Sequence, residues 1–316
     1  MRRGGPPMLP VDPASVPPYS RIERGQRGLR FAPVTAPGDA AGAPGPFLRV
    51  RAAAPASLRQ ASVVADGKLV LGAGLGVAYS LMAPKMHVVH DRRPPGLDRV
   101  IGAAGANAGL LHGDDGWRGV VLPSLGDLAA GLGDGPVAIR ADGRRYAAAH
   151  ETGVDEYDVG LEAASVFHTG VPVALVYAAD ASLVAAAGSR VGPPGVAPGD
   201  GSPIVELVAA SAVPRVAARH ADGTITVWEV GRPEPLASWA SPVADVGSIA
   251  LSADGALVAL GTPDAEAPVA ALASAFDGAQ VRRIEGARLI APAPEPETFL
   301  VAGDWGSAWL EPLEED

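Results

Sequence analysis

The stretch His220-Ala-Asp-Gly-Thr-Ile-Thr-Val-Trp-Glu229 decides the fold of this chain. An Asp-Gly pair directly before a run of β-branched and aromatic residues is typical of a tight hairpin corner that leads into a strand. Apolar residues occupy both odd and even positions of that run, for example Val227 and Trp228. Because successive side chains of a strand point to opposite faces, this strand is expected to pack between two stacked sheets.

The sequence around this stretch completes a unit of four strands. From the innermost to the outermost, we expect strands at 204–209, 215–220, 224–230 and 235–239. The next unit repeats the layout at 246–251, 256–261, 269–273 and 281–284. Asp-Gly corners such as Asp142-Gly143 and Asp254-Gly255 mark hairpins elsewhere in the chain.

A short motif repeats along the whole chain after apolar runs. A Gly or His is followed three or four residues later by a Gly or Asp, at Gly72…Gly76, His112…Gly116, His150…Gly153, Gly188…Gly192, His220…Gly223, Gly261…Asp264 and Gly303…Gly306. Successive first members are 40, 38, 38, 32, 41 and 42 residues apart, a spacing typical of four-stranded propeller blades. The sequence therefore predicts an all-β fold, a seven-bladed β-propeller of four-stranded antiparallel blades. The short interval contains a Pro/Gly-rich run at 191–201, which predicts an irregular fourth blade.

The two ends of the chain are expected to meet in the last blade. That blade has strands at 287–291, 298–303 and 307–310, and only an acidic tail follows. The segment Phe47-Leu-Arg-Val-Arg51 is expected to supply the missing outer strand, which would close the ring and cover an exposed sheet edge. The predicted domains are a Pro/Arg-rich extended arm at 1–45, outside the fold, and the propeller at 46–316.

The arm and the body have opposite charge. The first 30 residues contain six arginines and two carboxylates, a balance of +4, while the whole chain carries −10, so the rest carries −14. Ile22, Leu29 and Phe31 alternate with arginines, which suggests a short docking peptide. The arm could contact its own acidic ring, a protein partner or nucleic acid. Because phosphate binding needs a dense basic surface, nucleic acid is not expected as a partner except through this arm.

Composition indicates a bacterial protein that stays in the cytoplasm. The chain has no cysteine, which excludes disulfides and thiolate metal sites. Arginine outnumbers lysine 23 to 2, a bias that fits a GC-rich genome. The start of the chain lacks the apolar region of a secretory signal. The longest apolar stretch, 171–188, is interrupted by Pro172 and Asp180, so we expect two strands there and no membrane insertion.

The segment 220–229 resembles the core of a WD repeat, in which an Asp-Gly corner precedes a strand that ends in Trp-Asp. The Ser252-Ala-Asp-Gly255 stretch is similar to the same family's turn between its first two strands. By periodicity the likeness covers 47–313. The sequence departs from the family in lacking the Gly-His dipeptide before the first strand and in having Glu229 where the family has Asp, so the family's Asp–His–Ser–Trp hydrogen-bond network is not assumed. The resemblance implies a rigid, non-catalytic platform whose narrow face and central channel bind other proteins.

Candidate site residues lie at one repeat position and in the arm. His112, His150 and His220 each follow a predicted second strand, and with Asp114, Asp115 and Glu151 they could form a metal site. We favour the alternative, in which each histidine replaces the glycine of other blades and bonds to a corner backbone or to the following carboxylate. Acid pairs such as Asp155 and Glu156 are interpreted as solvated strand ends. The candidate partner-contact residues are Arg21, Arg24, Arg27, Arg30, Phe31, His112, Asp115, Trp117, His150 and Trp305.

The function is expected to be binding. The sequence contains none of the nucleophile, zinc-helix or serine–lysine motifs that would indicate an enzyme, and no cofactor or metal is expected. The leading hypothesis is a non-catalytic protein-protein interaction scaffold, a subunit of a cytoplasmic bacterial multiprotein assembly whose partners are other protein subunits. The first alternative is a sensor propeller that recognises a ligand or foreign protein for a neighbouring effector. The second is a metal-dependent, lactonase-like hydrolase with a site over the central channel.

Overall fold

The computed structural model describes most of the chain outside its N-terminal region. It describes residues 19–25, 28–33, 48–50, 58–83, 86–129, 131–159, 163–168, 172–262, 265–296, 298–303 and 306–312. The regular structure of these residues consists of strands alone, as predicted. No helix among them is long and apolar enough to span a membrane.

Seven sheets, numbered here in chain order, account for the described strands. Sheet one contains β4 (Gln60–Val64), β5 (Leu69–Gly74), β6 (Val77–Met82) and β7 (His87–Arg92). Sheet two contains β8 (Arg99–Gly102), β9 (Ala108–Gly113), β10 (Gly116–Val121) and β11 (Gly126–Ala129). Sheet three contains β12 (Val137–Ile139), β13 (Arg145–His150), β14 (Gly153–Asp158) and β15 (Ala163–His168). Sheets four and five are β16 (Ala174–Tyr177), β17 (Leu183–Ala187) and β18 (Arg190–Gly192); and β19 (Ile204–Ala209), β20 (Arg215–His220), β21 (Thr224–Glu229) and β22 (Ala237–Ala240).

The last two sheets include strands from the N-terminal region. Sheet six contains β23 (Ser248–Leu251), β24 (Leu257–Gly261), β25 (Val269–Ser274) and β26 (Gln280–Glu285), extended by β1 (Tyr19–Gly25) and β2 (Gly28–Pro33). Sheet seven contains β27 (Ala287–Pro292), β28 (Phe299–Gly303), β29 (Gly306–Pro312) and β3 (Leu48–Val50). Among the described sheets, six therefore have four blade strands or more, and sheet four has three.

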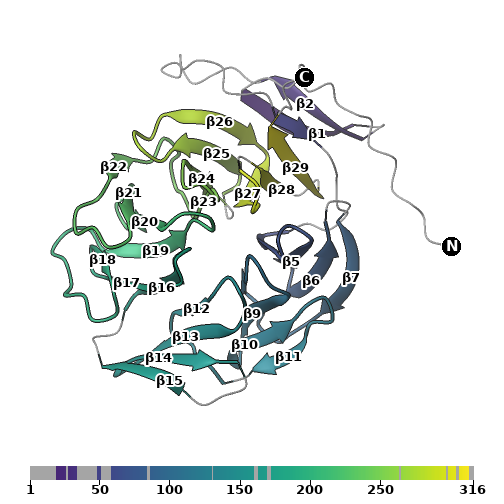
Figure 1. Cartoon of the computed structure of the whole chain (residues 1–316). Helices are drawn as coiled ribbons and strands as arrows, with labels where there is room; N and C mark the ends of the chain where they lie inside the picture. Colours follow the sequence, from purple (N-terminus) through teal and green to yellow (C-terminus); the bar gives the residue numbers. More distant parts are fainter. Residues whose placement is uncertain are drawn as a thin grey trace.

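The sheets are arranged radially as a β-propeller (Figure 1). The first strand of each sheet contacts the first strand of the next sheet around the ring, and β27 contacts β4 to close it. The hairpin corners agree with the sequence. Gly143 and Gly255, in the predicted Asp-Gly corners, both have φ of +67°, a left-handed conformation that glycine adopts without a steric penalty.

The core lies between neighbouring sheets. Between sheets six and seven, for example, Leu272, Ile290 and Phe299 pack in one cluster, and Phe299 is completely buried. Alanines fill many of the remaining core positions, so the sheets stack closely with few aromatic residues. The stacking rigidifies the ring because interiors packed in this way leave little free volume.

Sheet four is irregular where the Pro/Gly-rich run was noted. The segment after β18 folds back on the sheet: the amide of Gly199 donates to the carbonyl of Ala187 at 3.2 Å, and the amide of Gly201 donates to Ser189 Oγ at 3.0 Å. A backbone rich in proline lacks the donors of a regular outer strand. The predicted irregularity is confirmed.

Sheet seven is completed by the N-terminal region, as expected. Strand β3 pairs antiparallel with β29, with Leu48 opposite Pro312, Arg49 opposite Glu311 and Val50 opposite Leu310. The first described residues after the arm therefore supply the outer strand that the C-terminal sequence lacks.

The prediction that 1–45 lies outside the fold is wrong for two of its segments. β1 and β2 form an antiparallel hairpin, and β1 pairs in parallel with β26 through Tyr19 opposite Arg283 and Arg21 opposite Glu285. The physical reason is that an outer strand such as β26 has unpaired backbone groups, which attract any segment able to become extended. The arm residues outside β1 and β2, among them Arg27, lie outside the described residues, and so does Trp305 near the C-terminus.

Candidate partner-binding rim

The three repeat-position histidines lie on one rim of the ring. In each sheet the turn between the second and third strands lies at the same end of the sheet as the connection to the next sheet. We call this end of the ring the linker rim. His112 is near the end of β9, while His150 and His220 end β13 and β20. The repeat pattern therefore located all three on the linker rim, although in different sheets.

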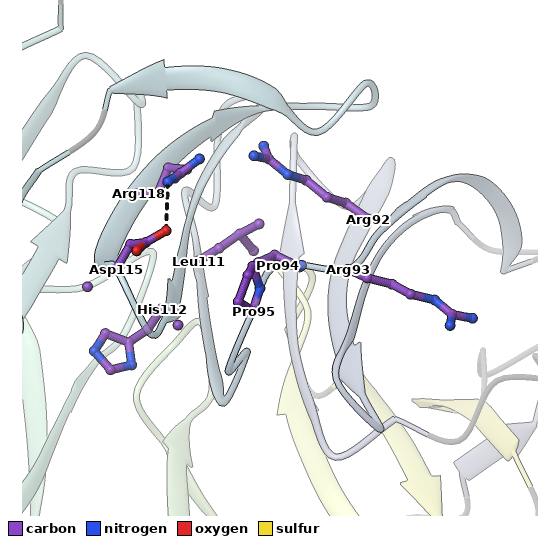
Figure 2. Close-up of a pocket in the computed structure, with 10 residues that line it drawn as sticks. Arg92, Arg93, Pro94, Pro95, Leu111, His112, Asp115 and Arg118 are labelled. Carbon is purple, nitrogen blue, oxygen red and sulfur yellow. Dashed lines mark ion pairs between the residues drawn. The ribbon is translucent and has the colours of Figure 1, made fainter.

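A small pocket on the linker rim lies between sheets one and two (Figure 2). Its volume is about 120 Å³, and the linker after β7 and the β9–β10 hairpin form its walls. Arg92 and Arg93 come from the linker side, and His112, Asp115 and Arg118 come from the hairpin side. The structure thus brings the predicted residues His112 and Asp115 together in one pocket.

Close backbone contact holds the two walls together. The amide of Asp114 donates to the carbonyl of Pro95 at 3.0 Å. A Cβ atom at position 113 would lie 2.3 Å from the same carbonyl oxygen, a distance that real Cβ atoms do not show. Glycine at 113 is therefore required for the hairpin to approach the linker, which fixes the shape of the pocket.

The pocket carries several ion pairs. Arg92 Nη1 lies 2.6 Å from Asp127 Oδ1, and Arg118 lies 3.5 Å from Asp115 and 3.6 Å from Asp127. The hydrogen bond from Arg92 lowers the pKa of the Asp127 carboxyl below its usual range. Arg93 is exposed and forms no ion pair with another described residue. It is the cation on this wall that is available to a partner.

His112 is fixed by a carboxylate and by an aromatic ring. Its Nδ1 lies 2.6 Å from Asp98 Oδ1, and its ring centroid is 4.9 Å from that of Trp117. Trp117 is only 3% exposed and packs in the core with Leu110 and Tyr146. The prediction of Trp117 as a partner contact is therefore wrong, because strand alternation turns its ring inward under His112.

His150 belongs to a polar cluster in sheet three. Its Nε2 lies 3.0 Å from Asp155 Oδ1, and Asp155 also accepts a hydrogen bond from the Tyr157 hydroxyl at 3.0 Å. Burial, with this bond, raises the pKa of Tyr157 to about 12. Glu156 is buried and accepts a hydrogen bond of 2.7 Å from Tyr177. The interpretation of this acid pair as solvated strand ends is wrong, because Tyr177 of the neighbouring sheet covers Glu156.

His220 is the most buried of the three histidines. Its Nδ1 lies 2.7 Å from the Ser202 carbonyl oxygen and its Nε2 lies 3.0 Å from Thr226 Oγ1. Since a carbonyl only accepts, Nδ1 must carry the hydrogen, and in the neutral ring Nε2 accepts from Thr226. His112 thus bonds to a carboxylate and His220 to a backbone carbonyl, while His150 Nδ1 accepts a hydrogen bond of 3.4 Å from the amide of Thr152. Among the described residues, no group of three or more His, Asp or Glu side chains is placed to hold a metal.

A charged pair on the first two strands of sheet five had no signal in the sequence. Glu206 Oε2 accepts hydrogen bonds of 3.1 Å from Arg219 Nε and from the amide of Ile249 in the next sheet. Burial raises the pKa of Glu206, and the nearby Arg219 opposes this shift. The pair ties sheets five and six together and was missed because neither residue is part of a repeated motif.

The linker contact at Gly113 gives a direct test of how the pocket is built. We expect Gly113→Ala to lower the free energy of unfolding by about 2 kcal/mol, because the new methyl group would overlap a carbonyl oxygen and force the hairpin away from the linker. Gly126→Ala is the matched control, because a Cβ at 126 would lie 3.4 Å from its nearest neighbour, Ser124 Oγ. Urea denaturation of both variants measures the effect, and equal losses would contradict the close-contact explanation.

Comparison with known proteins identifies the fold. No family model and no curated protein matches the sequence. The crystal structure of the β-propeller domain of Cps50 (Swd1) from Myceliophteria thermophila is similar, with a TM-score of 0.64 and 14% sequence identity, over 84% of this chain and 100% of that domain. In all, 1276 solved chains match this fold, so the likeness does not select one partner. The chain has a WD40-like β-propeller fold.

Proposed function

We propose that this chain is a non-catalytic protein-protein interaction scaffold, a subunit of a cytoplasmic bacterial multiprotein assembly, and that its seven sheets act as one seven-bladed ring. The proposal assigns partner binding to the linker rim around His112, Asp115 and Arg93. The fold supports it because a rigid ring presents many turns on one surface without needing a reacting group.

The size and chemistry of the rim pocket carry this proposal. At about 120 Å³ the pocket is smaller than the ~300–1,000 Å³ typical of sites that enclose a small molecule. Its acidic and basic groups are largely engaged with each other, and His112 is held by Asp98. Such a surface is suited to receive one or two side chains of a partner protein, with Arg93 available for a new ion pair.

A pair of charge reversals tests the proposal. The tagged parent protein and two tagged variants, Arg93→Glu and Lys68→Glu, would each be purified from the native host after mild crosslinking. The bound proteins would be quantified by mass spectrometry. Lys68 is exposed on the opposite rim, in the turn between β4 and β5, and its reversal changes the net charge by the same amount. We expect a stoichiometric protein to be reduced at least about fivefold by Arg93→Glu, as when attraction between charges becomes repulsion. Lys68→Glu should retain it.

Two results would contradict this proposal. The absence of any stoichiometric protein would contradict the scaffold function, and equal recovery with both variants would contradict the assignment of partner binding to the linker rim. Stoichiometric metal in protein purified without added ions would instead favour the hydrolase alternative. Elemental analysis of the same preparation measures it.

A further inference from the structure

The hairpin β1–β2 extends beyond the sheet to which it is attached. Its ladder with β26 ends where Arg21 lies opposite Glu285, the last residue of β26. The hairpin itself continues, with Ile22 opposite Phe31 and Gly25 opposite Gly28. These four further residue pairs span about 13 Å at the usual strand rise of ~3.3 Å per residue. Since β26 leads into the connection to sheet seven, the hairpin extends past the linker rim.

The two faces of the hairpin differ in character. Ile22 and Phe31 are register partners, and Leu29 lies two positions from Phe31 on the same strand, so strand alternation places these three residues on one face. Glu23 and Arg30 are register partners on the other face. Along β2 itself, Leu29 and Phe31 therefore lie on one face and Arg30 on the other, while Arg24, the register partner of Leu29, lies on the face of Leu29 and Phe31.

The hairpin also leaves one strand edge open. β2 ends the strand order of sheet six, so among the described strands nothing pairs with its outer side. The described hairpin residues include three arginines, Arg21, Arg24 and Arg30, and one carboxylate, Glu23. The rest of the chain is strongly acidic. An acidic segment would therefore be repelled by most of the ring and attracted to this edge.

Building on the proposed scaffold function, we propose that the open edge of β2 binds an extended segment of a partner protein in which apolar and acidic residues alternate. Strand addition supplies the backbone hydrogen bonds. Alternation then places the partner's apolar residues beside Leu29 and Phe31, and its acidic residues on the face of Arg30. The hairpin is thus a docking strand held on the ring by β26.

A designed peptide tests this proposal on the full-length chain. The probe is a fluorescein-labelled decapeptide of alternating valine and glutamate, and binding is measured by fluorescence anisotropy. Three further probes are an alternating valine and lysine peptide, the Val/Glu peptide with alternate backbone nitrogens methylated, and an oligothymidine of ten nucleotides. We expect the Val/Glu peptide alone to bind, because N-methyl groups remove the donors that a strand ladder requires.

Variants locate the peptide on the hairpin. Arg30→Glu is expected to weaken binding of the Val/Glu peptide at least about fivefold, because it places like charges side by side. Arg190→Glu, an exposed position on β18 of sheet four, carries the same charge change and is expected to bind like the parent protein. Thermal unfolding of both variants verifies that the ring is intact.

Several outcomes would overturn the proposal. Equal binding of the methylated peptide would exclude strand addition, and tighter binding of the oligothymidine would indicate nucleic acid. Self-association of the free protein that Arg30→Glu abolishes would show that a second copy occupies the edge. A failure of the peptide to bind, with the Arg93-dependent partner still recovered, would overturn this inference and leave the scaffold function standing.

Discussion

Deletion of residues 1–50 is expected to destabilise and aggregate the ring, whereas deletion of residues 1–45 leaves a folded, soluble protein. Only the longer deletion removes β3, which pairs with β29 through three register pairs. Loss of these backbone hydrogen bonds costs about 3 kcal/mol at a typical net value of ~1 kcal/mol each. The longer deletion also leaves the edge of β29 unpaired, which is a template for pairing between molecules.

The two deletions form a matched pair because both remove the β1–β2 hairpin. Any effect of exposing β26 is therefore present in each of them, and the difference reports on β3 alone. Thermal unfolding, with light scattering at 37 °C, measures stability and aggregation together. If both proteins unfolded at the same temperature and stayed monomeric, the pairing of β3 with β29 would contribute nothing to closure of the ring.

Local signals in the sequence predicted the strands of sheets five, six and seven. The predicted strands at 204–209 and 215–220 coincide with β19 and β20, since tight corners and alternating residues determine a hairpin within a few positions. The outer strand predicted at 235–239 is observed at Ala237–Ala240. Its start is shifted because Pro235 cannot donate a ladder hydrogen bond.

Pairing between distant segments was harder to predict. Closure by β3 could be inferred because the last sheet visibly lacked a strand. The pairing of β1 with β26 could not, since sheet six already had four strands and an additional strand leaves no gap in the repeat. The alternation of Ile22, Leu29 and Phe31 suggested docking, but the edge that β1 uses is a property of the assembled ring.

The candidate site shows the same limit. The repeat spacing located His112 and His150 on one rim, but the partner of His112 comes from another part of the fold. Asp98, which bonds His112, lies in the linker from the preceding sheet. Trp117 was misassigned because a tryptophan in a partly polar run has no local signal that distinguishes a core position from a surface one. Tertiary packing decides that question.

His220→Ala is expected to lower the free energy of unfolding by about 3 kcal/mol. The substitution leaves a cavity beside Trp228 and removes the acceptor of the buried Thr226 hydroxyl, which also lies 3.2 Å from Ser238 Oγ. Because Ser238 remains a partner of the hydroxyl, loss of the bond to His220 costs about 0.5–1.5 kcal/mol, and the cavity supplies the rest of the loss. His150→Ala is the control at the same repeat position. Its ring is 39% exposed, so we expect a loss below about 1 kcal/mol for that variant.

A double substitution separates the hydrogen bond from the packing. In His220→Leu with Thr226→Val both polar partners become apolar, so we expect the double variant to be more stable than the sum of the single losses predicts. Urea denaturation midpoints of the single and double variants measure this non-additivity. Strictly additive losses would show that the hydrogen bond between Thr226 and His220 contributes nothing to the stability of sheet five. Recovery in the double variant would show that the bond from Thr226 to His220 holds β20 and β21 together at the linker rim, in place of the hydrogen-bond network of typical WD repeats.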